Sequence, residues 1–205
     1  MTQSSGHPLQ CRCGTLRGVL ANPRSCTRVL CYCTDCQAFA HFLGDPTRVL
    51  DARGGSDVIQ VLPKHLTFTQ GLDALACMRL TPRGLVRWYT RCCRTPIGNT
   101  LATPTLSFIG LVHSCLGSSL DAAFGPVTVW VHTQGAKGDP KPKQAGSGKM
   151  IAWFLGTVLR ARFNGDYKLN PLFRRETGAL IATPQILSTD ERSRLMQAVC
   201  GRSGP

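Results

Sequence analysis

Cysteine is the residue type in this chain best placed to do chemistry, because seven of its eleven cysteines fall in three tight clusters. The clusters are CRC (Cys11, Cys13), CYCTDC (Cys31, Cys33, Cys36) and RCCRTP (Cys92, Cys93). Closely spaced thiols are typical of a redox centre, a stapled loop or a metal site. The start of the chain shows no export signal, so we expect a reducing compartment that disfavours persistent disulfides. The clusters therefore predict metal binding.

The first and third clusters together can supply one closed site. Zinc prefers four sulfur or nitrogen ligands, and structural sites usually combine two short ligand groups that are distant in sequence. Alternate strand residues point to opposite faces, so Cys11 and Cys13 reach one ion only if the chain turns after them. Gly14 permits that turn. Cys93 is the natural second half, with Cys92 beside it as a fourth ligand.

The middle cluster offers three thiols from one loop, Cys31, Cys33 and Cys36. Three protein ligands leave the fourth position of a zinc ion open, as in catalytic sites, whereas structural sites are closed. Such a centre suits the activation of an incoming thiol, because the thiolate is the nucleophilic form of sulfur. The alternative is a structural site that Cys26 or His41 completes. Asp35, between two ligands, is either an acid–base group or a surface carboxylate.

The other cysteines and histidines carry weaker signals. Three cysteines have no ligand-like spacing and are expected to be small buried residues: Cys77, Cys115 and Cys200. His41 lies between Phe39 and Phe42, which favours a packed histidine over a proton shuttle. His113 and Cys115 form an H-x-C pair, which alone is a weak indication of a half-site.

Several charged and aromatic residues surround the third cluster. The arginines are Arg79, Arg87, Arg91 and Arg94. Forked guanidinium contacts would suit the carboxylates of an acidic ligand, and solvated strand positions explain most of these arginines equally well. Trp88 and Tyr89 are expected to pack in the core rather than stack on a ligand.

Composition limits the class of protein. The chain has 205 residues, 42% of them hydrophobic, which supports a folded core. Its formal net charge of +13 indicates an anionic partner such as nucleic acid, an acidic small molecule or a membrane surface. The longest apolar run, MIAWFLGTVL (150–159), is about half of the ~20 residues that span a bilayer. We therefore expect a soluble, cytoplasmic protein without a transmembrane segment.

The segments that must position the cysteines are predicted to be short strands. Brief β-branched runs separated by glycine, proline and asparagine are typical of an antiparallel, mainly β domain. These runs are TLRGVL (15–20), TRVLCYC (27–33), SDVIQVL (56–62), HLTFTQ (65–70), GLVRWYT (84–90) and TLSFIGLV (105–112). No helical pattern in this part is long enough to suggest crossover helices.

Helices are predicted only near the C-terminal end. The spacing of apolar residues predicts a helix over 147–163, capped by Ser147 and ended by Asn164-Gly165. A second is predicted over 187–199, with Ser188 or Thr189 as its cap. These helices could pack on the sheet, which is our default, pair with a second subunit or lie on a membrane. The expected division is a tail (1–8), a zinc-binding β domain (9–132), a Gly/Pro/Lys-rich loop (133–149) and a helical extension (150–205).

The order of the clusters resembles the glutathione-dependent formaldehyde-activating enzyme family, which includes centromere protein V. The resemblance is carried by CRCGTLRG, CYCTDCQ and RWYTRCCRTPIGN and covers roughly residues 9–112. It implies the Mss4-like β-tent fold, built of short antiparallel sheets with one structural and one catalytic zinc. The enzymes of this family join formaldehyde to glutathione as S-hydroxymethylglutathione.

Carried over by position, the resemblance assigns the structural zinc to Cys11, Cys13 and Cys93 and the catalytic zinc to Cys31, Cys33 and Cys36. The sequence departs from the family pattern C-x-x-C-G, because Thr90 replaces the first cysteine and Arg94 replaces the glycine. Cys92 lies two residues after the usual position, so either a local bulge lets Cys92 serve as the fourth ligand or another group completes the site.

Two hypotheses follow. The first is a zinc-dependent carbon–sulfur lyase or synthase that acts on an aldehyde adduct of glutathione or another small thiol. The second is a non-catalytic zinc module that binds nucleic acid or another polyanion through its positive charge.

Overall fold

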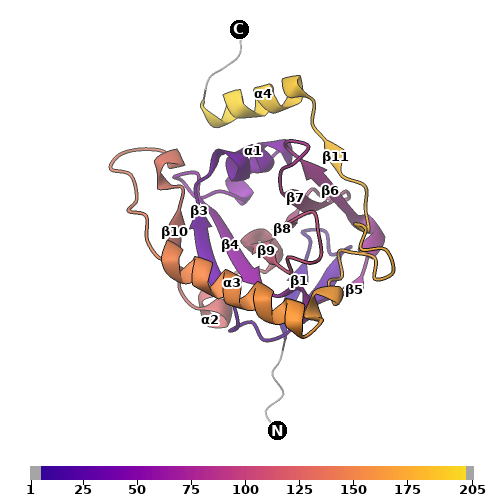
Figure 1. Cartoon of the computed structure of the whole chain (residues 1–205). Helices are drawn as coiled ribbons and strands as arrows, with labels where there is room; N and C mark the ends of the chain where they lie inside the picture. The colour runs from indigo at the N-terminus through magenta and orange to yellow at the C-terminus, as the bar shows by residue number, and fades with distance from the viewer. Residues whose placement is uncertain (1–5, 202–205) are drawn as a thin grey trace.

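The computed structural model describes residues 6–201 (Figure 1). Within that range the fold is mainly β, with a three-stranded and an eight-stranded sheet, and two helices follow in the C-terminal part. The expected fold class is therefore confirmed.

The small sheet has the strand order β1-β2-β5, and the large sheet has the order β10-β3-β4-β9-β8-β7-β6-β11. The small sheet contains β1 (His7–Gln10), β2 (Arg17–Leu20) and β5 (Leu66–Gln70). The large sheet contains β3 (Thr27–Cys31), β4 (Ser56–Val61), β6 (Leu75–Arg79), β7 (Val86–Thr90), β8 (Pro96–Thr100), β9 (Ile109–Val112), β10 (Val129–Val131) and β11 (Gln185–Ile186). Each run of residues predicted as a strand contains one of these strands.

The expectation of purely antiparallel sheets is wrong at both edges of the large sheet. β10 pairs parallel with β3, and β11 pairs parallel with β6. Parallel neighbours need a long crossover connection, and the many residues between each pair supply it. The predicted tail is also too long, since His7 and Pro8 already belong to β1; residues 1–5 of that tail lie outside the described range.

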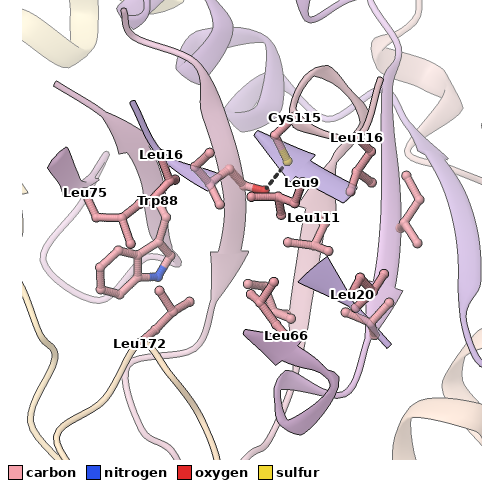
Figure 2. Close-up of a cluster of buried hydrophobic side chains, with 14 of the residues drawn as sticks. Leu9, Leu16, Leu20, Leu66, Leu75, Trp88, Leu111, Cys115, Leu116 and Leu172 are labelled. Carbon is pink, nitrogen blue, oxygen red and sulfur yellow. Dashed lines mark hydrogen bonds between the residues drawn. The ribbon is translucent and has the colours of Figure 1, made fainter. Parts of the chain in front are cut away.

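The main core lies between the two sheets. Figure 2 shows leucines of the small sheet, such as Leu9 and Leu20, in one buried cluster with Trp88 and Leu111 of the large sheet. Trp88 is fully buried, and its indole nitrogen donates a hydrogen bond to Thr100 Oγ1 over 2.9 Å. Trp88 and Tyr89 therefore pack in the core, as predicted.

The helices are α1 (Thr34–Phe42), α2 (Leu120–Phe124), α3 (Ser147–Phe163) and α4 (Thr189–Val199). The predicted C-terminal helices are both present. Ser188 caps α4 and forms a capping box with Glu191. The prediction that Ser147 caps α3 is wrong, because Gly146 occupies the cap and Ser147 is the first helical residue.

α1, like the short α2, is a helix that the sequence pattern did not reveal. It begins directly after Cys33, whose sulfur accepts a hydrogen bond from the Cys36 amide and so replaces the usual Ser, Thr, Asp or Asn cap. Its apolar side chains pack on the face of the large sheet that points away from the small sheet, and α4 lies over α1 (Figure 1). α1 therefore positions one end of the CYCTDC cluster against the sheet.

The segment after α3 also joins the body of the protein. Leu172 and Phe173 are buried in the main core, and β11 extends the large sheet. No helix within residues 6–201 is both long enough and apolar enough to cross a membrane.

Candidate metal centres

The first and third cysteine clusters meet at one place. Cys11, Cys13, Cys92 and Cys93 form a quartet whose four sulfur atoms all lie within 4.8 Å of one another. Cys11 and Cys13 occupy the turn between β1 and β2, and Cys92 and Cys93 occupy the turn between β7 and β8. Gly14 has a φ of +75°, so the chain does turn where the sequence required it. The quartet thus connects a hairpin of the small sheet to a hairpin of the large sheet.

The spacing of the quartet fits a tetrahedral metal. Zn–S bonds of about 2.3 Å in a tetrahedron place the sulfur atoms roughly 3.8 Å apart. The Cys11–Cys13 and Cys11–Cys92 sulfur distances are 3.5 and 3.9 Å, and the Cys92–Cys93 distance is 3.8 Å. The structure therefore brings Cys92 to the position of a fourth ligand, despite its offset in the sequence.

The quartet also holds thiols of different acidity. Burial raises the pKa of Cys93, but hydrogen bonds with Thr90 and Thr95 outweigh burial and lower this pKa to about 5. Thr90 Oγ1 lies 3.4 Å from the Cys93 sulfur and Thr95 Oγ1 lies 3.1 Å from it. Burial raises the pKa of Cys92 to about 11. A metal ion would displace the proton from Cys92, so binding at this site should release protons.

The second group is a trio. Cys31, Cys33 and Cys36 have their sulfur atoms within 4.8 Å of one another, and the Cys31–Cys36 distance is 3.9 Å. Cys31 is the last residue of β3, whereas Cys36 lies in the first turn of α1. The positive end of the helix dipole therefore faces the trio, which favours thiolate at this position.

A buried arginine places a positive charge beside the trio. Arg87 in β7 is only 2% exposed, and its Nη1 lies 3.9 Å from the Cys36 sulfur. The same nitrogen donates to Asn99 Oδ1 over 3.3 Å, and the guanidinium lies over the ring of Phe39. Hydrogen bonds with Cys31 and Cys33, followed by the charge of Arg87, hold the pKa of Cys36 well below its usual range. Of the two alternatives left open for these arginines, a solvated strand position therefore does not hold for Arg87.

Asp35 is the carboxylate nearest to this arginine. Its Oδ2 lies 3.9 Å from Arg87 Nη2, and its side chain is about half exposed to solvent. Hydrogen bonding with Cys33 and Cys36 raises the pKa of Cys31. The hydrogen bonds among the three sulfurs therefore favour the thiolate form at Cys36 over Cys31.

The groups that could have closed the trio do not join it. Among residues 6–201, neither Cys26 nor His41 belongs to the group of metal-compatible sulfur atoms. The Cys26 sulfur instead faces the Phe124 carbonyl, and His41 is partly buried, which lowers its pKa. The quartet and the trio can each hold a metal ion, and their all-sulfur ligand sets are compatible with zinc.

The other predicted cysteine roles are resolved by burial. Cys77 and Cys115 are buried in the main core, as expected. Cys200 is exposed just after α4, so the expectation of a buried residue is wrong there. His113 is largely buried, and this burial lowers its pKa; it is not part of either sulfur group.

A cavity of about 690 Å³ borders the quartet rather than the trio. Its lining includes Cys92, Cys93, Asp45 and four arginines, Arg12, Arg48, Arg91 and Arg94. α1 separates it from the trio, because Arg94 binds carbonyls at the C-terminal end of the helix and the trio lies at its N-terminal end, about 13 Å away. This cavity is therefore a basic pocket beside the quartet and apart from the trio.

Part of this site could have been found by closer reading of the strand pattern. In β7 the apolar residues Val86 and Trp88 face the main core, so the period of two places Arg87 on the opposite, α1-facing side. No comparable pattern in the sequence indicates the basic cavity, because its lining residues come from separate turns.

No curated protein matches this chain. A crystal structure of a Rhodobacter sphaeroides protein is similar to it at 16% sequence identity and a TM-score of 0.39, covering 60% of this chain and 99% of the other. The model of a family of unknown function, DUF6151, matches residues 3–177. The chain therefore belongs to the DUF6151 family.

Proposed function

We propose that the trio holds a zinc ion open to a small thiol such as glutathione, and that the protein joins this thiol to an aldehyde or reverses that reaction. The observation that carries the proposal is the trio itself: three converging sulfurs with no fourth Cys, His, Asp or Glu ligand among the described residues. The resemblance to glutathione-dependent formaldehyde-activating enzymes points to the same chemistry. That resemblance rests on the sequence motifs alone.

Each side chain of the trio region has a distinct task in this proposal. A zinc ion bound there would lower the pKa of an added thiol and hold it as thiolate. Arg87 offsets the negative charge of the sulfurs and, through its contact with Cys36, fixes where that charge lies. Asp35 is about half exposed to solvent, and its Oδ2 lies 3.9 Å from Arg87 Nη2, so its carboxylate faces both the solvent and the arginine beside the trio.

The reaction balances without a redox partner. The thiolate sulfur attacks the carbonyl carbon of the aldehyde and forms a carbon–sulfur bond. The π electrons of the C=O bond move to the oxygen, which takes up one proton, equal to the proton that the thiol lost. In the reverse direction the hydroxyl proton leaves and the carbon–sulfur bond breaks.

The test measures metal content and turnover together. Wild-type protein should hold two zinc ions per chain and should accelerate hemithioacetal formation from glutathione and at least one of several aldehydes. Cys33→Ser should lose one zinc and fall to the solution rate. Arg87→Met should keep the metal but lose about 10–100-fold in rate, as for other groups that tune metal ligands.

Cys200→Ser is the matched control, since Cys200 is exposed and belongs to neither sulfur group. It should retain both metal ions and full turnover. A wild-type protein that carries two zinc ions yet is no faster than solution for every aldehyde would remove the enzymatic proposal.

We infer a second candidate function from the basic cavity, namely the binding of nucleic acid or another polyanion. Four arginines and one aspartate line the cavity, and the whole chain carries +13. Affinity for duplex or single-stranded DNA should then fall steeply with salt. Arg12→Gln/Arg91→Gln should weaken binding and flatten the salt dependence, whereas Arg83→Gln, which lies outside the cavity, should do so less. An absence of binding at ~50 mM salt would exclude this function.

A further inference from the structure

α3 presents two very different faces. Figure 1 shows it crossing the outside of the molecule. The inner face packs against the body: Phe154 meets Phe108 edge-on at 5.6 Å, Met150 contacts Gln60, and Ala161 is buried. The outer face carries Ile151, Leu155, Leu159 and Phe163, which are 52%, 59%, 59% and 82% exposed. Four large apolar side chains, spaced four residues apart along one helix, are thus exposed to water.

These side chains form one continuous surface. At about 100° per residue, Ile151, Leu155, Leu159 and Phe163 wind across an arc of about 120°. Ala152, Gly148 and Gly156 fall within or next to the same arc, and a Cβ added at either glycine would meet no other atom within 4 Å. Monomeric proteins rarely leave an apolar patch of this kind uncovered unless it binds something.

The charges of α3 have only one sign. Its ionisable residues are Lys149, Arg160 and Arg162, and it contains no acidic residue. Lys149 and Arg160 lie on one side of the apolar arc, and Arg162 lies within it close to the opposite edge, which Ile151 marks. Lys168, which is also exposed, follows shortly after the helix. The apolar surface therefore has a cationic border.

The positive charges around this apolar surface distinguish between two possible binding partners, a second copy of the chain and an anionic membrane. In an antiparallel pair of α3 helices from two copies, Lys149 of one helix would lie near Arg160 and Arg162 of the other, and like charges would repel. An anionic lipid surface suits both the apolar side chains and the positive charges of α3. The apolar side chains would insert at the boundary between headgroups and acyl chains, while lysine and arginine reach the phosphate and carboxylate groups. We propose that α3 lies flat on an anionic membrane surface and attaches the protein to it. This goes beyond the proposed chemistry of the trio and does not depend on it.

Vesicle sedimentation of the full chain tests this proposal. Phosphatidylcholine vesicles and vesicles that also contain about 30% phosphatidylserine are compared at low salt. Wild type should bind the anionic vesicles and should bind pure phosphatidylcholine far more weakly. Leu155→Ser/Leu159→Ser should weaken binding at least about thirty-fold, because two leucines no longer leave water. Lys149→Gln and Arg160→Gln should each weaken it about five-fold.

Ile186→Ser and Arg83→Gln are matched controls, since both residues are exposed and lie outside α3. Each should bind the anionic vesicles as wild type does. The proposal is overturned if wild type does not bind anionic vesicles at low salt, or if the double leucine variant binds them equally well. It is also overturned if light scattering shows a wild-type dimer that the leucine variant converts to monomer, because a second copy then covers the helix.

Discussion

Arg94 shows how a residue other than glycine can occupy a left-handed backbone position at a cost that its own side chain offsets. Its φ is +53°, a left-handed conformation that costs an ordinary residue about 1–2 kcal/mol. Its guanidinium donates to the carbonyls of Phe42 and Leu43 at the end of α1 and lies 4.8 Å from the ring centroid of Phe42. These contacts with α1 therefore offset the cost of the left-handed backbone at Arg94.

We expect Arg94→Ala to be more harmful than Arg94→Gly. The alanine loses the contacts with α1 and keeps the backbone strain, whereas the glycine loses the contacts but relieves the strain. The free energy of unfolding should fall by about 2 kcal/mol for Arg94→Ala and by about 1 kcal/mol for Arg94→Gly. Urea unfolding of the three proteins measures this order, and equal stability of the two variants would show that the φ of Arg94 carries no strain.

At the scale of elements, Arg28 connects three of them. It is buried in β3 and binds both carboxylate oxygens of Asp57 in β4, with nitrogen–oxygen distances of 2.7–3.1 Å. It also pairs with Asp121 in α2 and donates to the Gly125 carbonyl over 2.7 Å. Since β3 ends at Cys31, this ion-pair network anchors the strand that carries the trio.

Removal of Arg28 should leave the negative charge of Asp57 without its ion-pair partner. Arg28→Ala should lower the free energy of unfolding by about 3–5 kcal/mol, because Asp57 then remains in a largely buried site without its cation. Arg28→Ala/Asp57→Ala should be no less stable than Arg28→Ala alone. Denaturant unfolding of both variants measures the difference, and full additivity of the two substitutions would contradict a coupled pair.

The elements also show where sequence reasoning works and where it stops. α4 could be predicted because Ser188 and Glu191 form a capping box, which depends only on residues close together in the sequence. α1 could not, because a cysteine caps it and its packing partners are distant strands. The parallel edges of the large sheet depend on crossover paths that strand patterns do not encode.

The same distinction applies to the candidate site. The separation of the seven cysteines into a quartet and a trio could be predicted from their spacing. The place of Arg87 beside Cys36 and the basic cavity beside the quartet depend on which side chains the fold brings together.

At the scale of the whole molecule, the quartet and the trio hold together very different lengths of chain. Cys13 and Cys92 are 79 residues apart and belong to different sheets, whereas Cys31 and Cys36 are only 5 residues apart. Treated as a crosslink, the first closes a loop worth about 4.5 kcal/mol of chain entropy and the second about 2 kcal/mol. A metal in the quartet should therefore support the fold as a whole, and a metal in the trio should support mainly its own loop.

We accordingly expect Cys13→Ser to lower the free energy of unfolding by at least about 2 kcal/mol more than Cys33→Ser does. Amide hydrogen exchange should locate the loss: Cys13→Ser should speed exchange in β1, β2 and β5, because a metal in the quartet would connect the β1–β2 turn to the β7–β8 turn. Cys33→Ser should speed exchange only around the start of α1. Chelator added to wild type should reproduce the Cys13→Ser pattern once the tighter metal is removed. If both variants lose equal stability and leave β1, β2 and β5 equally protected, the two sheets are held by the leucine core alone and the quartet has no structural role.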